Sequence, residues 1–507
     1  MSKSSHRHFT NLITVSRCFV VRACLSFGCL LTRSDCVQTA VPPKDASEVA
    51  VRRFRALIKQ ARTKVPFYAS RLGNIPTKDE GAINRDGLSL FDCLTQFPLT
   101  TKDDVETNFP DRITDGSDSS DWRLMSTRGT AQRLITVQGF AKRDAVRAAQ
   151  LRSLRLSGGY QPGMPMVEIP PEICDVVCGD EGERDEGVLS QAWEMFRNRR
   201  LLDAKSVREL RGLVERHWIL NRKMYPGFGR FGSHPPNHVL DEYVKRLRRD
   251  RPYVLKALAT YLVAIAKHIR DNNVQPLSIP VIKTMGSRVT PSQRAVLEQS
   301  FGGTYWDDYG SAEFGSIACE CDQHDGLHVF DDLFFVEVVD AEGKRMPDGK
   351  LGWIVVTDLV NTTMPLIRYK IGDVGTMTAE TCQCGRTAPR IKVKGRAFDT
   401  IVDGQSRWRT TDDIVDFLED FPGVDSGQLT AIGNQRYELT VVEDPKQTLD
   451  QPKLCDEFSS WIGQDAKIEL RVASTLQPES GGKFRYVRGD LDQQRAEQIV
   501  SSGFSPP

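Results

Sequence analysis

The sequence has almost no net charge, no long uninterrupted apolar run and no internal repeat, and each absence narrows the class of protein. Its 68 Lys and Arg stand against 67 Asp and Glu, a formal net charge of +1 at pH 7. Without a basic or acidic excess we expect no nucleic-acid partner and no solvating tail. Arg17 and Arg22 interrupt the most apolar stretch, Leu12 to Leu31, so we expect no stable membrane span.

The same stretch is a poor signal peptide, because no clean apolar centre leads into a small-residue cleavage site. We interpret residues 1–46 as a leader or disordered extension, with a targeting segment as the alternative. We expect a cytoplasmic protein.

Cysteine is concentrated in two places. Of the 12 cysteines, four lie before residue 37, and four form the C-x-C pairs Cys319/Cys321 and Cys382/Cys384. This is not the pattern of a small secreted disulfide scaffold. Together with His324 and His328, the pairs could form a Cys₃His zinc site. Unligated thiols and a disulfide are the alternatives.

The length, 507 residues, and a composition of 39% hydrophobic and 27% charged residues indicate two or three globular domains. Helical periodicity predicts helices over 47–62, 142–156 (with an Arg-rich outer face), 253–269 and 291–301, the last capped by Thr290. Strands are predicted over 134–137, 280–284 and 304–307, and Thr101 is expected to cap a helix. Alternating strands and helices favour parallel pairing.

The second half of the chain has a different pattern. Short strands are predicted over 334–339, 352–357 and 366–369, with turns between them. After residue 395 a smaller mixed segment follows, with a helix at 414–417 and strands at 429–432 and 438–442. The charged stretch 179–225 reads as a helical insertion, and we take 179–240 as its extent.

Four short motifs could carry chemistry, although each alone would more often be a surface turn. The first, Tyr309 to Glu313, follows a predicted strand, where α/β sheets bind ligands. The second ends at Asp373, expected just past a strand and a glycine. The third is Gly395-Arg396, with Asp399 behind it. The fourth, Gly481 to Arg485, presents Lys483 on a glycine-rich loop.

In this order and spacing, the four motifs resemble those of the adenylate-forming superfamily. Within it, the chain is similar to the phenylacetate–CoA ligase branch, which includes capsule-biosynthesis and coenzyme F390 synthetase-like proteins. Residues 65–68, 97–104 and 326–329 support that branch. The resemblance runs from about residue 50 to 490 and is strongest between 280 and 400.

The resemblance implies ATP, Mg²⁺ and CoA or another acceptor, with a small, possibly aromatic, carboxylic acid as substrate. It implies that Tyr309, within Tyr309-Gly310-Ser311, stacks on adenine and that Asp373 accepts the ribose hydroxyls. Glu313 is expected to hold Mg²⁺, and Lys483 and Arg396 to act on the reacting groups. Gly286 and Ser287 are expected behind the adenine. Related chains also favour Cys321, His328, Cys382 and Cys384 as zinc ligands, in a structural site beside the nucleotide.

Two departures from the family pattern concern the chemistry. The phosphate loop retains Ser126, Thr127, Gly129 and Thr130, but Gln132 stands where a second glycine is usual. A glutamine narrows the backbone angles open to a loop that wraps phosphate, and Arg128 or Arg133 could compensate by pairing with phosphate. Phe398 replaces a commonly charged hinge residue.

We therefore expect an α/β protein with the fold of an adenylate-forming enzyme. A large multi-layer N-terminal domain with mixed sheets is expected over 47–394, and a small α+β lid domain over 395–507. The predicted function is an AMP-forming acid–CoA ligase. The alternatives are a degenerate nucleotide-binding paralogue without catalysis and an adenylyltransferase acting on a non-carboxylate acceptor.

Overall fold

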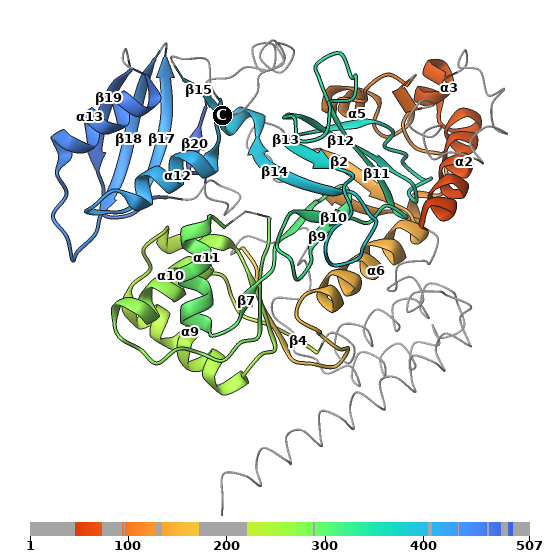
Figure 1. Cartoon of the computed structure of the whole chain (residues 1–507). Coiled ribbons are helices and arrows are strands. Elements are labelled where there is room, and N and C mark those ends of the chain that lie inside the picture. The colour runs from red at the N-terminus through yellow and green to blue at the C-terminus, as the bar shows by residue number, and fades with distance from the viewer. Residues whose placement is uncertain are drawn as a thin grey trace, which may run out of the picture.

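The computed structural model describes residues 46–72, 94–95, 97–126, 134–171, 221–286, 289–403, 408–433, 435–463, 466–477 and 485–489 (Figure 1). The predicted leader and most of the predicted insertion lie outside the described residues, as do Thr127, Gly129, Thr130, Ser287 and Lys483. Within the described part, no helix is both long and apolar enough to cross a membrane.

The first described helices pack on the outside of the largest sheet. They are α2 (Ala46–Lys64), α3 (Pro66–Leu72) and α5 (Lys102–Asn108). The helix expected from residue 47 is confirmed. So is the cap at Thr101, whose hydroxyl accepts a hydrogen bond from the Asp104 backbone N–H at 3.1 Å. The Asp104 carboxylate accepts from the Thr101 N–H in return, which satisfies two helix-end donors at once.

A seven-stranded antiparallel sheet holds the main core, in the order β11-β12-β13-β14-β10-β9-β8. Its strands are β8 (Asp308–Ser311), β9 (Gly315–Glu320), β10 (Leu327–Val329), β11 (Phe334–Val339), β12 (Gly352–Asp358), β13 (Tyr369–Thr378) and β14 (Arg390–Arg396). Two of the three predicted strands are confirmed. The strand expected over 366–369 is wrong, because β13 begins only at Tyr369. Arg368 before it adopts a left-handed backbone (φ 47°) and turns its guanidinium onto the buried Glu337.

Helix α6 (Phe140–Leu156) confirms the predicted helix over 142–156 and packs against β9 behind the hairpin β1 (Arg123–Ser126) and β2 (Ile135–Gln138). The expected Arg-rich outer face is wrong in part, because Arg152 and Lys142 point inward and are buried. Lys142 pairs with Asp358 at 2.5 Å, and Arg152 pairs with Asp332 at 2.5 Å. A buried cation with a partner carboxylate avoids the large penalty of an unpaired one.

A five-stranded sheet, all parallel as predicted, forms the second layer. Its order is β4 (Arg222–Met224), β3 (Met166–Ile169), β5 (Val254–Ala257), β6 (Val281–Thr284) and β7 (Thr304–Tyr305). Apolar side chains of α9 (Asn237–Asp250), α10 (Ala259–Asp271) and α11 (Pro291–Phe301) pack on one face. The N-cap predicted at Thr290 is confirmed.

The helix predicted over 253–269 is wrong in its first turn. Residues 254–257 form strand β5 between β3 and β6, and the helix begins at Ala259. A short apolar run buried on both faces is typical of a central parallel strand, and it cannot be told from a helix by periodicity alone.

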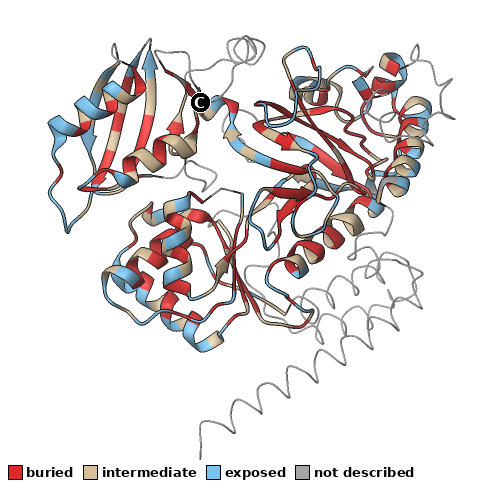
Figure 2. Cartoon of the chain, in the orientation of Figure 1, coloured by how far each residue is buried: buried red, intermediate tan, exposed pale blue. Residues whose placement is uncertain are grey.

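The C-terminal elements have a hydrophobic core of their own, made of residues between Ile401 and Val487. We call residues 401–488 the lid. It contains β15 (Ile401–Val402), β16 (Trp408–Arg409), α12 (Thr411–Asp420), β17 (Val424–Gly433), β18 (Arg436–Glu443), α13 (Gln451–Ile462), β19 (Lys467–Val472) and β20 (Val487–Arg488). Figure 2 shows the buried residues gathered along the lid strands and the facing sides of its helices. The boundary at residues 394/395 stays a prediction.

Candidate nucleotide site and cysteine cluster

Three predicted site residues meet in the largest sheet although they come from three different strands. The Tyr309 hydroxyl of β8 donates a hydrogen bond to Asp373 Oδ2 of β13 at 2.7 Å. Arg396 Nε of β14 lies 3.3 Å from Asp373 Oδ1. One oxygen of this buried carboxylate therefore accepts a hydrogen bond and the other lies in an ion pair, while the Arg396 side chain keeps 52% of its exposure.

The backbone of β13 is distorted where it presents Asp373. Its pairing with β12 shifts register between the Trp353–Val374 and Val355–Lys370 pairs, and Gly372 has φ 90°. An irregularity of this kind re-aims a side chain at a ligand site. Asp373 was expected just past a strand. It lies inside the strand instead, directly across from Arg396 in β14.

The Tyr309–Glu313 motif was expected in a loop following a strand, and this is also corrected. Tyr309, Gly310 and Ser311 belong to β8, and Glu313 lies in the tight turn into β9. A Cβ on Gly310 would lie 2.2 Å from the Gly315 carbonyl oxygen, so only glycine fits this hairpin. The Ser311 Oγ is buried without a hydrogen-bond partner among the described residues, so it is available to a ligand.

Tyr369 is a site residue to which the sequence analysis gave no role. It lies close enough to the buried Glu313 for the Glu313 charge to act on its hydroxyl. Burial, followed by the charge of Glu313, raises the pKa of Tyr369 strongly. The available signal was its place on the same strand as Asp373, four residues earlier. The contact itself depends on how β8 and β13 meet, which the sequence does not specify.

The electrostatics of the cluster keep the two tyrosines neutral and the arginine charged. Burial raises the pKa of Tyr309 well above its usual value, and the Asp373 charge raises it further. The Asp373 charge is also the largest cause of the raised pKa of Arg396, with burial opposing it and Glu313 adding to it. Tyr309 therefore stays a hydrogen-bond donor across the physiological range.

The remaining predicted residues either lie at the ends of other elements or fall outside the described part. Ser126 is the last residue of β1, and Gly286, exposed and with φ 70°, follows β6. Between β14 and the lid, Phe398 is 38% exposed, and Asp399 Oδ1 accepts a hydrogen bond from Arg485 Nε at 2.9 Å. Arg485 lies just before β20. Its ion pair with Asp399 therefore connects the segment between β14 and the lid to the segment that carries the predicted Lys483 loop.

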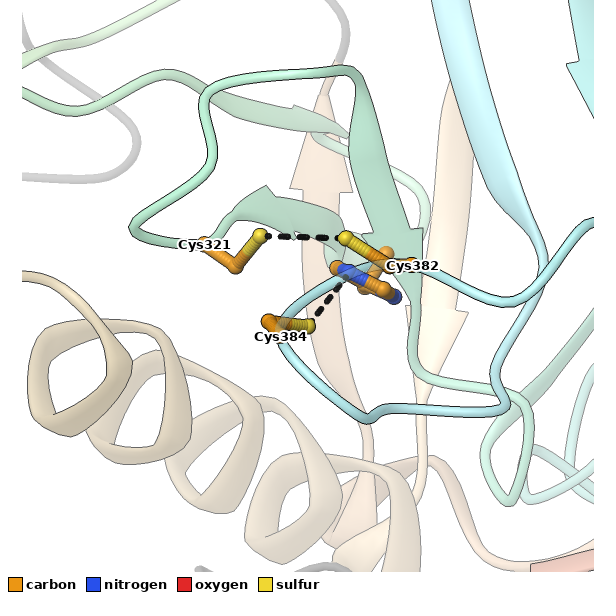
Figure 3. Close-up of side chains that lie close together, drawn as sticks. Cys321, Cys382 and Cys384 are labelled. Atoms are coloured by element: carbon orange, nitrogen blue, oxygen red, sulfur yellow. Dashed lines mark hydrogen bonds between the residues drawn. The ribbon is translucent and has the colours of Figure 1, made fainter.

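A second cluster brings together the four residues that the resemblance had favoured for zinc. The ligand atoms of Cys321, His328, Cys382 and Cys384 all lie within 4.8 Å of one another (Figure 3). The sulfurs of Cys321 and Cys382 are 3.8 Å apart, and Cys384 Sγ is 3.4 Å from His328 Nε2. A tetrahedron with Zn–S bonds of about 2.3 Å has edges of about 3.8 Å, so the spacing suits zinc. The cysteines are free, which excludes the disulfide alternative in this structure.

The surroundings of this cluster also suit a metal ligand set. His328 Nδ1 lies 3.1 Å from the Ala388 carbonyl oxygen, an interaction that fixes the ring with Nε2 toward the sulfurs. By contrast, His324 Nδ1 lies 2.9 Å from Glu320, and Cys319 is buried in the main core. The expectation that the cluster lies beside the nucleotide site stays a prediction. Cys382 and Cys384 follow β13, the strand that carries Asp373, and Cys321 follows β9, which pairs with the Tyr309 strand β8.

The arrangement of these elements has a clear counterpart among solved structures. The crystal structure of 2-hydroxyisobutyryl-CoA ligase in the postadenylation state, with its acyl-AMP, superposes with a TM-score of 0.64. The match covers 91% of this chain and 93% of that one at 19% identity. The same ligase in its CoA-bound thioesterification state gives 0.53. The chain therefore has the fold of an adenylate-forming acyl-CoA ligase.

Its sequence is similar to phenylacetate–CoA ligases, as the motifs predicted. The ligase of Pseudomonas putida is 24% identical over 465 residues, 87% of this chain and 94% of that protein. The ligase of Thermus thermophilus is 25% identical over 359 residues, 69% of this chain and 70% of that protein. No family model matches the sequence.

Proposed function

We propose that this chain is an ATP-dependent ligase that converts a carboxylic acid to its acyl-adenylate and passes the acyl group to CoA. The observation that carries the proposal is the Asp373 carboxylate, buried and held at both oxygens by Tyr309 and Arg396. Such a group is suited to accept both hydroxyls of a ribose. The similarity to phenylacetate–CoA ligases along most of the chain supports the reaction class.

In the first step a substrate carboxylate oxygen attacks the α-phosphorus of ATP. The bond to the bridging oxygen breaks, and pyrophosphate leaves with its electron pair. Asp373 and the Tyr309 ring hold the nucleoside, and Ser311 offers its unpartnered hydroxyl. Arg396, half exposed and directed at Asp373, supplies positive charge near the reacting phosphate, where preorganised charge lowers the barrier most.

The Glu313 carboxylate fits a magnesium ion. It is a hard oxygen ligand, and it is buried close to the Tyr369 hydroxyl. When bound, Mg²⁺ neutralises charge on the phosphates and on the departing pyrophosphate. The chain's own contribution is to hold Glu313 in the β8–β9 turn, within the same cluster as Asp373.

Lys483 and the loop from Ser126 to Thr130 complete the proposed site. The lysine neutralises charge between the carboxylate and the α-phosphate, and the hydroxyls of Ser126, Thr127 and Thr130 bind the terminal phosphates. In the second step the CoA thiolate attacks the acyl carbon, and AMP leaves. The acid is small, and the similarity to phenylacetate–CoA ligases makes aromatic acids the first class to test.

We further propose a structural zinc ion at Cys321, His328, Cys382 and Cys384. Its place in the chain assigns it to the turn between β13 and β14, where it ties that turn to β9 and β10. Two domains, 47–394 and 395–507, and a cytoplasmic location complete the proposal. Free cysteines and the use of ATP and CoA fit that compartment.

The test is ATP–pyrophosphate exchange with a panel of small aromatic and aliphatic carboxylic acids, followed by mass spectrometry of the products. We expect exchange that depends on one class of acid, and an acyl-adenylate among the products. Nucleotide binding without exchange for any acid would favour the degenerate paralogue. An adenylylated product that contains no carboxylate-derived group would favour the adenylyltransferase.

A further inference from the structure

The lid rests on the parallel-sheet layer through polar and charged contacts. In Figure 1 it lies directly above α10 and α11. Asp425, in β17, is the centre of these contacts. Its Oδ2 lies 2.8 Å from His234 Nε2 and its Oδ1 lies 3.1 Å from Lys267 Nζ of α10. The same ammonium donates to the Asp425 backbone carbonyl at 2.7 Å.

The three groups are mostly shielded from water. The Asp425 side chain keeps 14% of its exposure and that of Lys267 keeps 19%. Burial alone would raise the pKa of Asp425, but the hydrogen bond with His234 and the positive charge of Lys267 lower it to about 2. The carboxylate is therefore ionised at any pH at which the enzyme is expected to work.

A second carboxylate of the lid makes a similar contact one helix away. Glu419, in the last turn of α12, accepts hydrogen bonds from Ser292 Oγ at 2.7 Å and from Gln293 Nε2 at 2.8 Å. Both donors belong to the first turn of α11, whose N-terminal end carries a partial positive charge that favours an anion. Farther along the lid, Ser233 and Leu476 exchange two hydrogen bonds of 3.0 Å.

Charged groups and hydrogen bonds cross this interface at several points, while the lid and the parallel-sheet layer each have a separate hydrophobic cluster in the described part of the chain. An interface held by charges and hydrogen bonds is easily dissolved and reformed, because water replaces each lost contact at a small net change in free energy. The interface therefore suits a lid that separates from α10 and α11 and docks on them again.

We propose that Asp425 and Glu419 form a polar latch that holds the lid on α10 and α11 in the arrangement that makes the acyl-adenylate. This assignment rests on the proposed function. The whole chain superposes better on the postadenylation form of the ligase with this fold, which holds its acyl-AMP, than on the CoA-bound form, with TM-scores of 0.64 and 0.53. Asp425 and Glu419 are positioning residues, since they act through the place of the lid.

The test compares Lys267→Glu, which sets two carboxylates against each other, with the charge-reversed double variant Lys267→Glu/Asp425→Lys. Lys446→Glu is the matched control, because Lys446 pairs with Asp271 at the same interface but is 57% exposed, and such pairs contribute little. Small-angle X-ray scattering of the full-length chain reports the lid position without any substrate. Circular dichroism confirms that each variant is folded.

We expect Lys267→Glu to increase the radius of gyration, Lys446→Glu to match the wild type, and the double variant to recover part of the difference, since it restores the ion pair with residue 267 but loses the contact with His234. With an active acid, Lys267→Glu should slow acyl-adenylate formation about tenfold, a scale typical of coupled charged pairs, without slowing thioester formation from supplied acyl-adenylate. Unchanged scattering for Lys267→Glu, or no recovery in the double variant, would overturn the latch. Absence of acyl-adenylate from the wild type would overturn the proposed function but leave the scattering test standing.

Discussion

Asp373 is the single side chain on which nucleotide binding depends most. Replacing it by alanine removes the acceptor for two ribose hydroxyls, and charge-assisted hydrogen bonds contribute about 1.5–3 kcal/mol each. We expect Asp373→Ala to weaken ATP binding by at least about a hundredfold in isothermal titration calorimetry. Tyr309→Phe keeps the ring and loses only the hydrogen bond to Asp373, so it should weaken binding less than about tenfold. Wild-type affinity in Asp373→Ala would refute the assignment.

Asp331 gives a prediction about pH. It is largely buried beside Asp332, which holds Arg152 and Arg53. Burial first, and then the Asp332 charge, raise the pKa of Asp331 from 3.8 to about 6. The folded state therefore keeps a proton that the unfolded state releases, so its contribution to stability is present below about pH 4 and is lost as pH rises through about 6.

Asp331→Asn should remove this loss of folding stability at high pH, because asparagine carries no charge at any pH. We expect the variant to be more stable than the wild type by about 3 kcal/mol at pH 8, and by only about 1 kcal/mol at pH 4.5, where most of the wild-type protein still holds the proton. Urea unfolding at the two pH values measures the difference. As a control, Asp332→Asn should destabilise the protein at pH 8, since it leaves the buried Arg152 without its carboxylate. A stabilisation of Asp331→Asn that is the same at both pH values would contradict the prediction.

At the scale of elements, the cysteine cluster should bind one metal ion and hold the β13–β14 turn. We expect elemental analysis to find close to one zinc per chain, and Cys382→Ser to lose it and to lower the melting temperature by at least about 5 °C, because a structural zinc contributes directly to folding energy. Cys455→Ser is the matched control, since Cys455 is a free cysteine on α13 in the lid. Wild-type protein that contains no zinc after gentle purification would contradict the assignment of a zinc site to this cluster.

Elements whose signals are local were predictable from the sequence. The caps at Thr101 and Thr290 were found because a hydroxyl three residues before a polar side chain is a short-range pattern. The start of α10 was missed because three of the four β5 residues are apolar and buried, as in a helix, and only the pairing with β3 and β6 identifies the strand. The caps depend on residues close together in the chain and were predictable. The strand depends on pairing with residues far away in the chain and was not.

The candidate site shows the same limit. Its residue types were predictable from the motifs, but Asp373 was placed after its strand, because a bulge set by pairing with β12 has no local signature. The Tyr369–Glu313 contact was missed for the same reason. The four zinc candidates were selected by resemblance, and their convergence depends on the pairing of β10 with both β9 and β14.

At the scale of the whole molecule, Lys483 distinguishes an enzyme from a nucleotide-binding module. If the lysine acts only when the lid is in place, it stabilises the transition state more than bound ATP. We expect Lys483→Ala to slow acyl-adenylate formation by about a hundredfold or more, and to leave ATP affinity nearly unchanged. Lys483→Arg, which keeps the charge, should recover part of the rate. Equal single-turnover rates for Lys483→Ala and wild type would show that the lysine takes no part in acyl-adenylate formation.

The most direct measurement of the proposed function follows an oxygen atom. An active acid labelled with oxygen-18 in its carboxylate is incubated with the protein, ATP, Mg²⁺ and CoA, and the AMP is analysed by mass spectrometry. If the carboxylate attacks the α-phosphorus and CoA then expels AMP from the acyl carbon, the AMP retains one oxygen-18 from the acid. Unlabelled AMP, or AMP formed equally without any acid, would contradict an acyl-adenylate intermediate.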